Sequence, residues 1–165
     1  MSRLTPLKRM DLLVRALAEP EAAGIRCAIA GDGDEAPRLL ALVKELGLDG
    51  RVRLIGTLSD DDLVRSYAQC RAVVFPALAE DYGLVAVEAF ASRKPVVTCT
   101  DSGGPAELVV DGIHGLVAAP TPATLARALR RLADDASLAE RMGQQAGLLA
   151  DQITWPVTLE KLLLR

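Results

Sequence analysis

The sequence predicts an α/β domain built on a doubly wound parallel sheet. Half of the 165 residues are hydrophobic but only 3% are aromatic, so the interior must consist of Leu, Val, Ile and Ala, as in a parallel sheet covered by helices. Short β-prone runs alternate with longer amphipathic helical runs, which is the pattern of repeated βαβ units. The length suits one domain, residues 1–165.

The predicted elements follow one another along the whole chain. Helices are expected at 9–18, 34–46, 83–91, 122–133, 137–149 and 156–164, with another opened by Ser59, and strands at 25–30, 51–55, 72–75 and 95–100. Gly47 favours the end of the second helix, and Pro76 stops the third strand. The Ser59 side chain can cap the helix that follows it, with Asp62 three residues on completing a capping box.

Charge and cysteine content exclude several classes of function. Lys and Arg number 19 against 22 Asp and Glu, a formal net charge of -3, which gives no general attraction for nucleic acid or anionic membranes. No apolar run is long enough to span a bilayer, and the N-terminus has no signal-peptide core. The three cysteines, which form no CxxC pair, are expected to be reduced core thiols in a cytoplasmic protein, without zinc or disulfides.

The segment after the third strand carries the main candidate site, because ligands of open parallel sheets bind beyond the carboxyl ends of the strands. Gly83 lets a backbone approach a ligand closely, and the free N–H groups of the following helix form an anion site. Glu80 and Glu88 would lie about 12 Å apart along a helix, whereas a retaining glycosidase holds its carboxyls about 5 Å apart. They are interpreted as two contacts on one long ligand; the alternative is a solvated loop residue and an exposed helical one.

Two further segments complete the pattern. Arg3 and Lys8 place two cations before the first helix, where they can neutralise a diphosphate without a metal or can be ordinary surface charges. After the fourth strand, Gly103 and Gly104 permit a close backbone approach to a ligand.

The order of these motifs, together with Gly31-Asp32-Gly33, resembles the C-terminal domain of the group 1 glycosyltransferases over nearly the whole chain. This family consists of retaining enzymes of GT-B architecture, so the resemblance implies a Rossmann-like donor-binding half of such an enzyme. It implies a nucleoside-diphosphate sugar as donor, no required metal or other cofactor, and a role such as polysaccharide biosynthesis. The most specific element is the glutamate pair with the Tyr-Gly-Leu-Val sequence between its members.

Site residues are carried over from the resemblance position by position. Arg3 and Lys8 would hold the diphosphate and stabilise the leaving nucleotide, Glu80 would contact the transferred sugar, and Glu88 the ribose hydroxyls. The catalytic set is thus Arg3, Lys8 and Glu80, and the donor-binding set is Gly31, Leu54, Ile55, Gly56, Asp81, Tyr82, Gly83, Leu84, Val85, Glu88, Gly103 and Gly104. The base is expected near residues 54–56, mostly against backbone.

The sequence departs from the family at three points. Ser2 and Asp81 stand where the family usually has glycine, and Asp81 adds negative charge near a dianionic ligand. The acceptor-binding domain would precede Met1, so the chain needs an N-terminal domain or a partner chain, through which at most peripheral membrane contact is expected. The helical segment 151–165 would pack toward that missing half.

Parts of the sequence also fit other functions. Gly31-Asp-Gly33-Asp-Glu-Ala36 fits a dinucleotide fingerprint, but the acidic residue expected about 20 positions later is absent. Asp32-x-Asp34 has the spacing of a metal-binding DxD, although helix capping is the simpler role. His114 is predicted to lie in a solvated turn. A catalytically incomplete binding module and a nucleotide-sugar epimerase remain as alternatives.

Overall fold

The computed structural model describes residues 1–153. The predicted helix at 156–164, and most of the segment 151–165, lie outside the described residues. The helices are α1 (Met10–Ala18), α2 (Ala36–Glu45), α3 (Asp60–Gln69), α4 (Leu84–Ala91), α5 (Gly104–Leu108), α6 (Pro122–Asp134) and α7 (Ala136–Ala150), with 3-10 turns at Pro6–Lys8 and Pro20–Ala22. The strands are β1 (Cys27–Ala30), β2 (Val52–Gly56), β3 (Val73–Val74), β4 (Val96–Cys99) and β5 (Gly115–Ala118).

All strand pairs are parallel, which confirms the predicted class, but the strands form two separate sheets. One sheet consists of β1 and β2, and the other has the order β3-β4-β5. The turn expected around His114 is present at residues 112–114, but strand β5, which follows it, was not predicted. Gly115 begins this strand so close to β4 that a side chain there would overlap the backbone of Val96.

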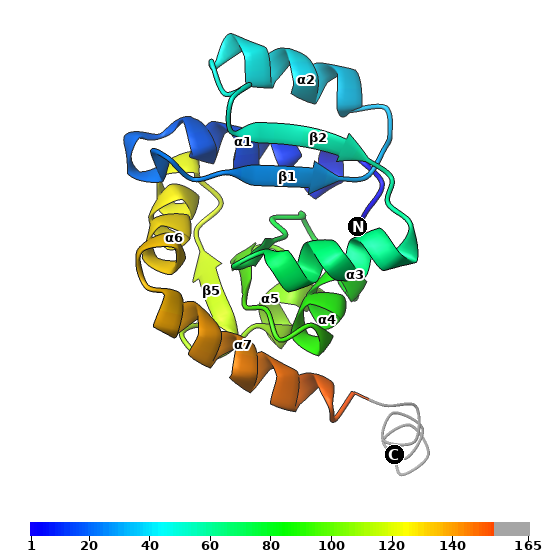
Figure 1. The fold of residues 1–165 in the computed structure, drawn as a ribbon, viewed down its shortest axis with the longest axis vertical. Helices are drawn as coiled ribbons and strands as arrows, with labels where there is room; N and C mark the ends of the chain where they lie inside the picture. The colour runs from blue at the N-terminus through cyan, green and yellow to red at the C-terminus, as the bar shows by residue number, and fades with distance from the viewer. Residues whose placement is uncertain (154–165) are drawn as a thin grey trace.

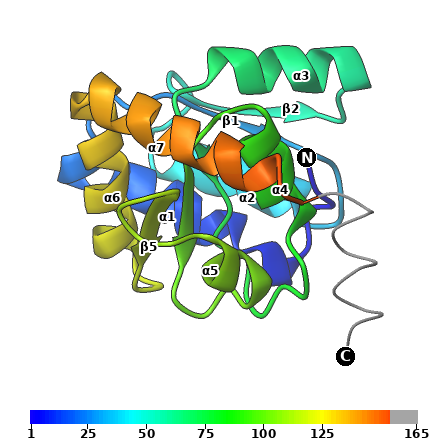
Figure 2. The same ribbon diagram turned by 90° about the horizontal axis from the view of Figure 1, so that it is seen from below.

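Helices lie on both sides of the strands (Figures 1 and 2). Figure 2 shows α1 and α3 on opposite faces of the β1–β2 sheet, with α6 beside α1. The larger hydrophobic cluster joins α1, α2 and α6 to β1 and β2, and a smaller one centres on Phe90 and Ala86 of α4 with Tyr67 of α3. Among residues 1–153, no helix is both long and apolar enough to cross a membrane.

The segment before α1 is built into the fold. Leu4 is almost fully buried, its N–H donates to the carbonyl of Asp32 (2.8 Å), and its carbonyl accepts from Glu35 (3.3 Å). A side chain at Gly31 or Gly33 would overlap this segment. Glycine is therefore required at both positions, because it lets the segment before α1 pack closely against the loop after β1.

Two helix starts test the capping predictions. The side chain of Ser59 accepts from the N–H of Asp62 (3.2 Å), which confirms the cap of α3. Helix α2 begins later than predicted, at Ala36, and its N-cap residue Glu35 makes no side-chain cap. The predicted capping role of Asp32 and Asp34 is therefore wrong: Asp32 accepts from the adjacent N–H of Gly33 (2.7 Å), and Asp34 lies near Arg3.

Candidate functional site

Loops from several parts of the chain meet beyond the carboxyl ends of β3 and β4. Figure 1 shows the N-terminal segment approaching this region from the side of β1 and β2. The N–H of Leu78, in the loop after β3, donates to the carbonyl of Leu7 (2.7 Å). This bond holds the 3-10 turn Pro6–Lys8 against the loop that carries Glu80.

Lys8 and Glu80 form the central ion pair of the site. The ammonium of Lys8 contacts the carboxylate of Glu80, and both side chains are largely buried, 20% and 24% exposed. The same ammonium lies 5.5 Å from the ring centre of Phe75, at the end of β3, within the range of a cation–π contact. Two residues 72 positions apart are thus brought together, as their predicted roles on one ligand require.

Glycines after β4 hold the backbone of Glu80 in place. Glu80 forms an isolated bridge with Gly103, and its carbonyl accepts from the N–H of Gly104 (2.8 Å). A side chain at Gly103 would meet the carbonyl of Glu80, and one at Gly104 the carbonyl of Asp81. Both glycines are needed for this contact between loops, and whether they also touch a donor stays a prediction.

The start of α4 presents unpaired main-chain donors. Gly83 is its N-cap residue, has a φ of 73°, and makes no side-chain cap. Among the described residues, the N–H groups of Gly83, Leu84 and Val85 have no hydrogen-bond acceptor. Free N–H groups at a helix N-terminus bind anions such as phosphate, so this end of α4 has the chemistry that the sequence predicted.

Glu88 lies one turn further along α4 and is hydrogen-bonded. Its carboxylate accepts from the buried hydroxyl of Tyr67 on α3 (2.7 Å), and the Met1 ammonium lies 3.5 Å away. Burial, and next the bond to Glu88, raises the pKa of Tyr67 well above its ordinary value. The Glu88 side chain remains 42% exposed, so part of it stays open to a ligand while Tyr67 fixes its orientation.

Arg3 is not part of this cluster. Its side chain is 74% exposed, and its nearest acidic partner is Asp34, at 3.9 Å. Two of the predicted donor-binding residues lie beside the other sheet. Gly31 packs against the backbone of Ser2, and Ile55, near the end of β2, is 37% exposed. The structure thus joins Lys8 to Glu80 directly and places Glu88 further along α4, while Arg3 and residues 54–56 lie on the side of β1 and β2.

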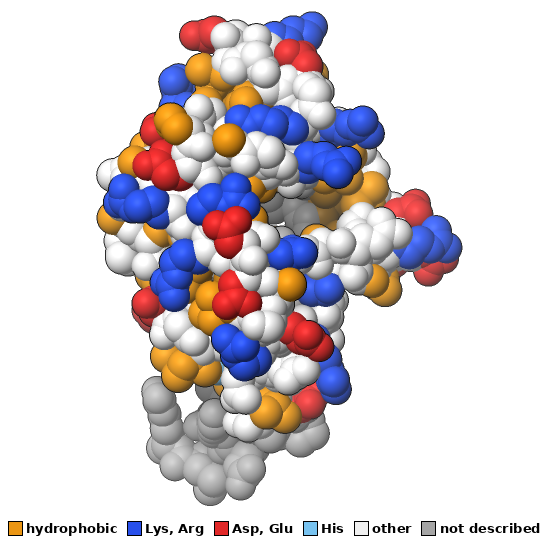
Figure 3. Space-filling model, turned by 60° about the vertical axis from the view of Figure 1, so that its left-hand side comes forward, with side chains coloured by type: hydrophobic (Ala, Val, Ile, Leu, Met, Phe, Trp, Pro, Cys, Tyr) orange, Lys and Arg blue, Asp and Glu red, His pale blue; other side chains and the backbone are white. Residues whose placement is uncertain are grey.

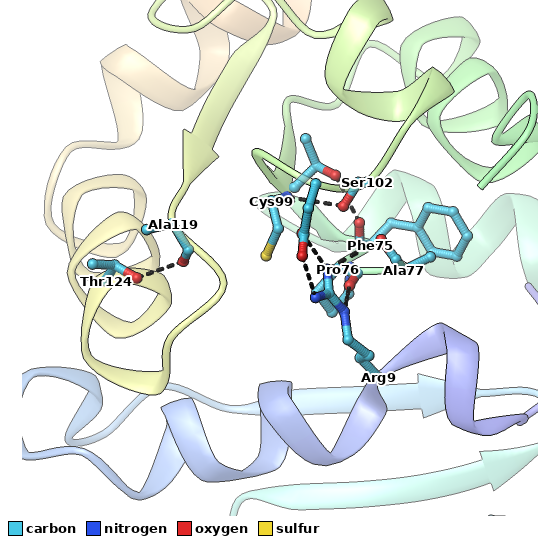
Figure 4. A network of polar contacts seen from close by, with 10 residues as sticks. Arg9, Phe75, Pro76, Ala77, Cys99, Ser102, Ala119 and Thr124 are labelled. Atoms are coloured by element: carbon cyan, nitrogen blue, oxygen red, sulfur yellow. Dashed lines mark hydrogen bonds and ion pairs between the residues drawn. The ribbon is translucent and has the colours of Figure 1, made fainter. Parts of the chain in front are cut away.

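Arg9 and Asp101 were missed by the sequence analysis. The guanidinium of Arg9 makes a two-pronged bond to Asp101 (2.6 and 2.8 Å) and donates to the carbonyls of Pro76 (2.7 Å) and Ala77 (3.2 Å). Figure 4 shows this side chain reaching from the start of α1 to the loops after β3 and β4. The guanidinium holds the pKa of Asp101 below its ordinary value, through their hydrogen bonds. A left-handed φ of 49° at Arg9, uncommon outside glycine, was the local feature that sequence patterns could not reveal.

No metal centre is assembled by the described residues. Across positions 1–153, no group of three or more His, Cys, Asp or Glu side chains is arranged to hold an ion. The three cysteines are free thiols, with Cys99 buried and Cys27 and Cys70 partly buried. His114 lies in the turn before β5, where it packs on the Phe90 ring, with ring centres 5.7 Å apart.

Comparison with known proteins identifies the family. The family model described as Glycosyl transferases group 1 matches residues 1–148. The chain is 37% identical to the D-inositol 3-phosphate glycosyltransferase of Nocardia farcinica, over 99% of this chain and 38% of that protein. It is 35% identical to the alpha-D-kanosaminyltransferase of Streptomyces kanamyceticus, over 90% of this chain and 39% of that protein. It therefore spans about two fifths of the length of these relatives.

Solved structures agree with this assignment. The Anabaena protein HepE, in complex with UDP and glucose, superposes with a TM-score of 0.85 at 29% identity, over 99% of this chain and 45% of that one. Sucrose-phosphate synthase from Thermosynechococcus elongatus gives a TM-score of 0.89 at 27% identity, over 99% of this chain and 43% of that one. The chain belongs to the group 1 glycosyltransferases.

Proposed function

We propose that this chain is the donor-binding half of a retaining glycosyltransferase that takes a sugar from a nucleoside-diphosphate sugar and transfers it to an acceptor hydroxyl. The observation that carries the proposal is the cluster of Lys8, Glu80 and the free N–H groups at the start of α4. A cation, a sugar-binding carboxylate and an anion-binding helix end are the groups that a diphosphate sugar requires. HepE was crystallised with UDP and with UDP-glucose, so these are the first ligands to test.

Each group has a defined role in the proposed reaction. The Lys8 ammonium and the α4 N–H groups stabilise the negative charge that develops on the departing diphosphate, and Arg3 swings from the surface to join them. Glu80 orients the transferred sugar, and Glu88 accepts from the ribose hydroxyls. Because no side chain of the cluster is placed as a nucleophile, the departing phosphate itself takes the acceptor proton, and catalysis rests on positioning. No metal is required in this mechanism.

Two glutamate variants distinguish a contact to the nucleotide from a contact to the sugar. Glu88→Ala removes the ribose contact, so it should weaken UDP and UDP-glucose alike, by about ten- to a hundredfold, as expected for a hydrogen bond to a charged group. Glu80→Ala removes only the sugar contact, so it should weaken UDP-glucose much more than UDP. Isothermal titration calorimetry measures both affinities. Equal losses for the two ligands in both variants would contradict these roles.

Two lysine variants test whether Lys8 binds the diphosphate. Lys8→Met should reduce UDP affinity by about tenfold or more, because the buried ammonium faces the phosphate. Lys44→Met changes the same side chain on the exposed last turn of α2 and should leave the affinity unchanged. Addition of EDTA should also leave binding intact, and loss of binding in EDTA would instead support the Asp32-x-Asp34 metal site.

A catalytically incomplete binding module is the second candidate function. This candidate is favoured by the length of the chain relative to its homologues, since the chain covers only 38% of the Nocardia relative. In this alternative the chain binds the donor and acts only when an acceptor-binding domain or partner chain docks. The epimerase alternative has no observation of its own in the structure that favours it.

A further inference from the structure

Arg9 differs from the cations of the protein surface. Figure 3 shows Lys and Arg side chains spread over the face that it draws, mixed with Asp and Glu. The Arg9 side chain is only 18% exposed, and its guanidinium donates to both carboxylate oxygens of Asp101 and to two main-chain carbonyls. A cation is held out of water only where charged and carbonyl acceptors replace its hydration. The contacts of Arg9 are therefore a fixed part of the structure.

Arg9 is next to Lys8 in the chain, and its acceptors lie on the two segments that hold Glu80. Its two carbonyl acceptors are at the start of the loop that leads to Glu80. Its carboxylate partner, Asp101, uses its own main-chain carbonyl to accept from the N–H of Ala79 (3.0 Å), the residue before Glu80. One side chain therefore connects the backbone beside Lys8 with the backbone beside Glu80.

The backbone is strained next to both of these groups. Among residues 1–153, three residues other than glycine have a positive φ, and two of them are Arg9 (49°), directly after Lys8, and Ala79 (46°), directly before Glu80. A residue with a Cβ adopts this left-handed conformation at a cost, and the conformation persists only where surrounding contacts enforce it. The structure thus gives up stability at the two positions that set the directions of Lys8 and Glu80.

The ion pair of Lys8 and Glu80 is not sufficient to hold the two groups in place around a ligand. In the proposed function, the ammonium turns to the diphosphate and the carboxylate turns to the sugar, so donor binding weakens their direct contact. The bond from Arg9 to Asp101 uses neither of these groups and remains. Apart from it, the turn and the loop are joined by the main-chain bond from the Leu78 N–H to the Leu7 carbonyl.

We propose that Arg9 is a positioning residue for the donor sugar, which holds Glu80 at the distance from Lys8 that a diphosphate and its sugar span. The inference rests on the proposed function, in which Lys8 binds the diphosphate and Glu80 the sugar. Arg9 does not touch the donor, because its guanidinium faces Asp101 and the carbonyls of the loop. Its effect reaches the ligand through Glu80, so loss of Arg9 weakens the sugar contact more than the nucleotide contacts.

Calorimetric titration with UDP and with UDP-glucose tests the proposal. Arg9→Gln should lower the affinity for UDP-glucose relative to UDP by about tenfold, as expected when a hydrogen bond to a charged group is lost. The affinity for UDP itself should change much less. Arg9→Lys keeps the charge but lacks the planar fork that serves a carboxylate and carbonyls together. It should therefore show the same relative loss, and it provides a second variant where Arg9→Gln folds poorly.

Arg51→Gln is the matched control for a general loss of stability. Arg51 also donates to main-chain carbonyls, those of Leu17, Ala22 and Ile25, and these lie at the other end of α1 from Arg9. Its replacement should destabilise the fold, because three carbonyls lose a charged donor. The affinity for UDP-glucose relative to UDP should stay unchanged, since no contact of Arg51 leads to Glu80.

A double variant distinguishes a positioning role from an independent one. In the Glu80→Ala background, Arg9→Gln should cause no further change in the affinity for UDP-glucose relative to UDP, because residues that act through one another are not additive. A further loss in that background would overturn the proposal. So would an unchanged relative affinity in Arg9→Gln, or an equal change in Arg51→Gln. Failure of the original chain to bind UDP would instead contradict the proposed function, and this inference with it.

Discussion

At the scale of single residues, Arg9 ties the two loops of the site together. Its guanidinium serves four acceptor atoms on the segments after β3 and β4, and its side chain is only 18% exposed. Arg9→Gln should therefore lower the free energy of unfolding by about 1–3 kcal/mol, because several partly buried acceptors lose a charged donor. Chemical denaturation measures the change. The exposed Arg141 on α7 is the control, and Arg141→Gln should cost less than about 0.5 kcal/mol; equal losses would contradict the role of Arg9.

The same pair predicts a dependence on pH. Arg9 holds the pKa of Asp101 below its ordinary value of 3.8. Since the folded pKa is lower than the unfolded one, the stabilisation is fully present above about pH 4 and is lost as the pH falls through the folded pKa. Asp101→Asn should be less stable than the original chain at pH 7, and the difference should shrink in more acidic buffers. A difference that stays constant in denaturation series from pH 7 to pH 3 would exclude this coupling.

The raised pKa of Tyr67 predicts that stability is lost at alkaline pH, the opposite direction to Asp101. Burial and the bond to Glu88 raise its pKa above the ordinary value of 10.0, so its stabilising contribution is present below about pH 10 and is lost as the pH rises through the folded pKa. The chain has two tyrosines, so Tyr82→Phe leaves Tyr67 as the only one. In that variant, tyrosinate absorbance should appear only when the protein unfolds. Tyrosinate formation at about pH 10 in the folded state would show that Tyr67 is not held by Glu88.

Sequence reasoning reached only part of this residue-level picture. The roles of Glu80, Lys8 and Glu88 were carried over from a family resemblance, since nothing local in the sequence indicates that residues 8 and 80 touch. Arg9 was assigned only to a helix start, since its partner lies 92 positions away. Contacts at such separations depend on the complete fold, whereas the cap at Ser59 depends on three consecutive peptide units and was predicted from sequence alone.

At the scale of elements, the start of α4 depends on one glycine. Gly83 has a φ of 73°, and a side chain there would also overlap the ring of Pro105 on α5. Gly47 has a similar φ of 65° with nothing within 4 Å of such a side chain. Gly47→Ala should therefore cost about 1 kcal/mol of unfolding free energy, for the backbone conformation alone. Gly83→Ala should cost more, about 2–4 kcal/mol, because the clash is added.

Calorimetric or denaturant unfolding of both glycine variants measures this difference. Gly83→Ala should also weaken UDP binding, since the displaced N–H groups of α4 are the proposed phosphate donors, while Gly47→Ala should bind UDP normally. Similar stability losses in the two variants would mean that α4 and α5 move apart at little cost and do not define the site.

Helices with long repeats of apolar residues were predictable from the sequence. Residues in α6 and α7 repeat their apolar positions over three turns or more, so they were identified close to their observed limits. Strand β5 was missed because it has four residues, begins with a glycine and follows a turn containing His114, so its local pattern resembles a loop. Its identity as a strand comes from β4, which pairs with all four of its residues.

At the scale of the whole molecule, exposed hydrophobic residues lie next to the site residues in the chain. Four large hydrophobic residues lie within four positions of Lys8 or Glu80 in the sequence: Leu7, Leu78, Tyr82 and Leu84, which are 60%, 39%, 57% and 63% exposed. Four large hydrophobic side chains near a charged cluster are typical of a surface that another domain covers. This agrees with a chain that spans 38% of its Nocardia relative, and we expect the proposed acceptor-binding half to cover this surface.

The chain alone should therefore bind UDP-glucose without transferring its sugar. Transfer requires an acceptor hydroxyl held against the donor in a site that excludes water, and in the proposed function a second domain holds that acceptor. Incubation of the chain with UDP-glucose and a panel of polyol acceptors should release UDP no faster than the Lys8→Met variant does. Joining the chain to an acceptor-binding domain should raise that rate while the calorimetric affinity for UDP changes little, because the domain supplies the second substrate and not the first. Sugar transfer by the chain alone, absent in the Lys8→Met and Glu80→Ala variants, would show instead that these 165 residues form a complete active site.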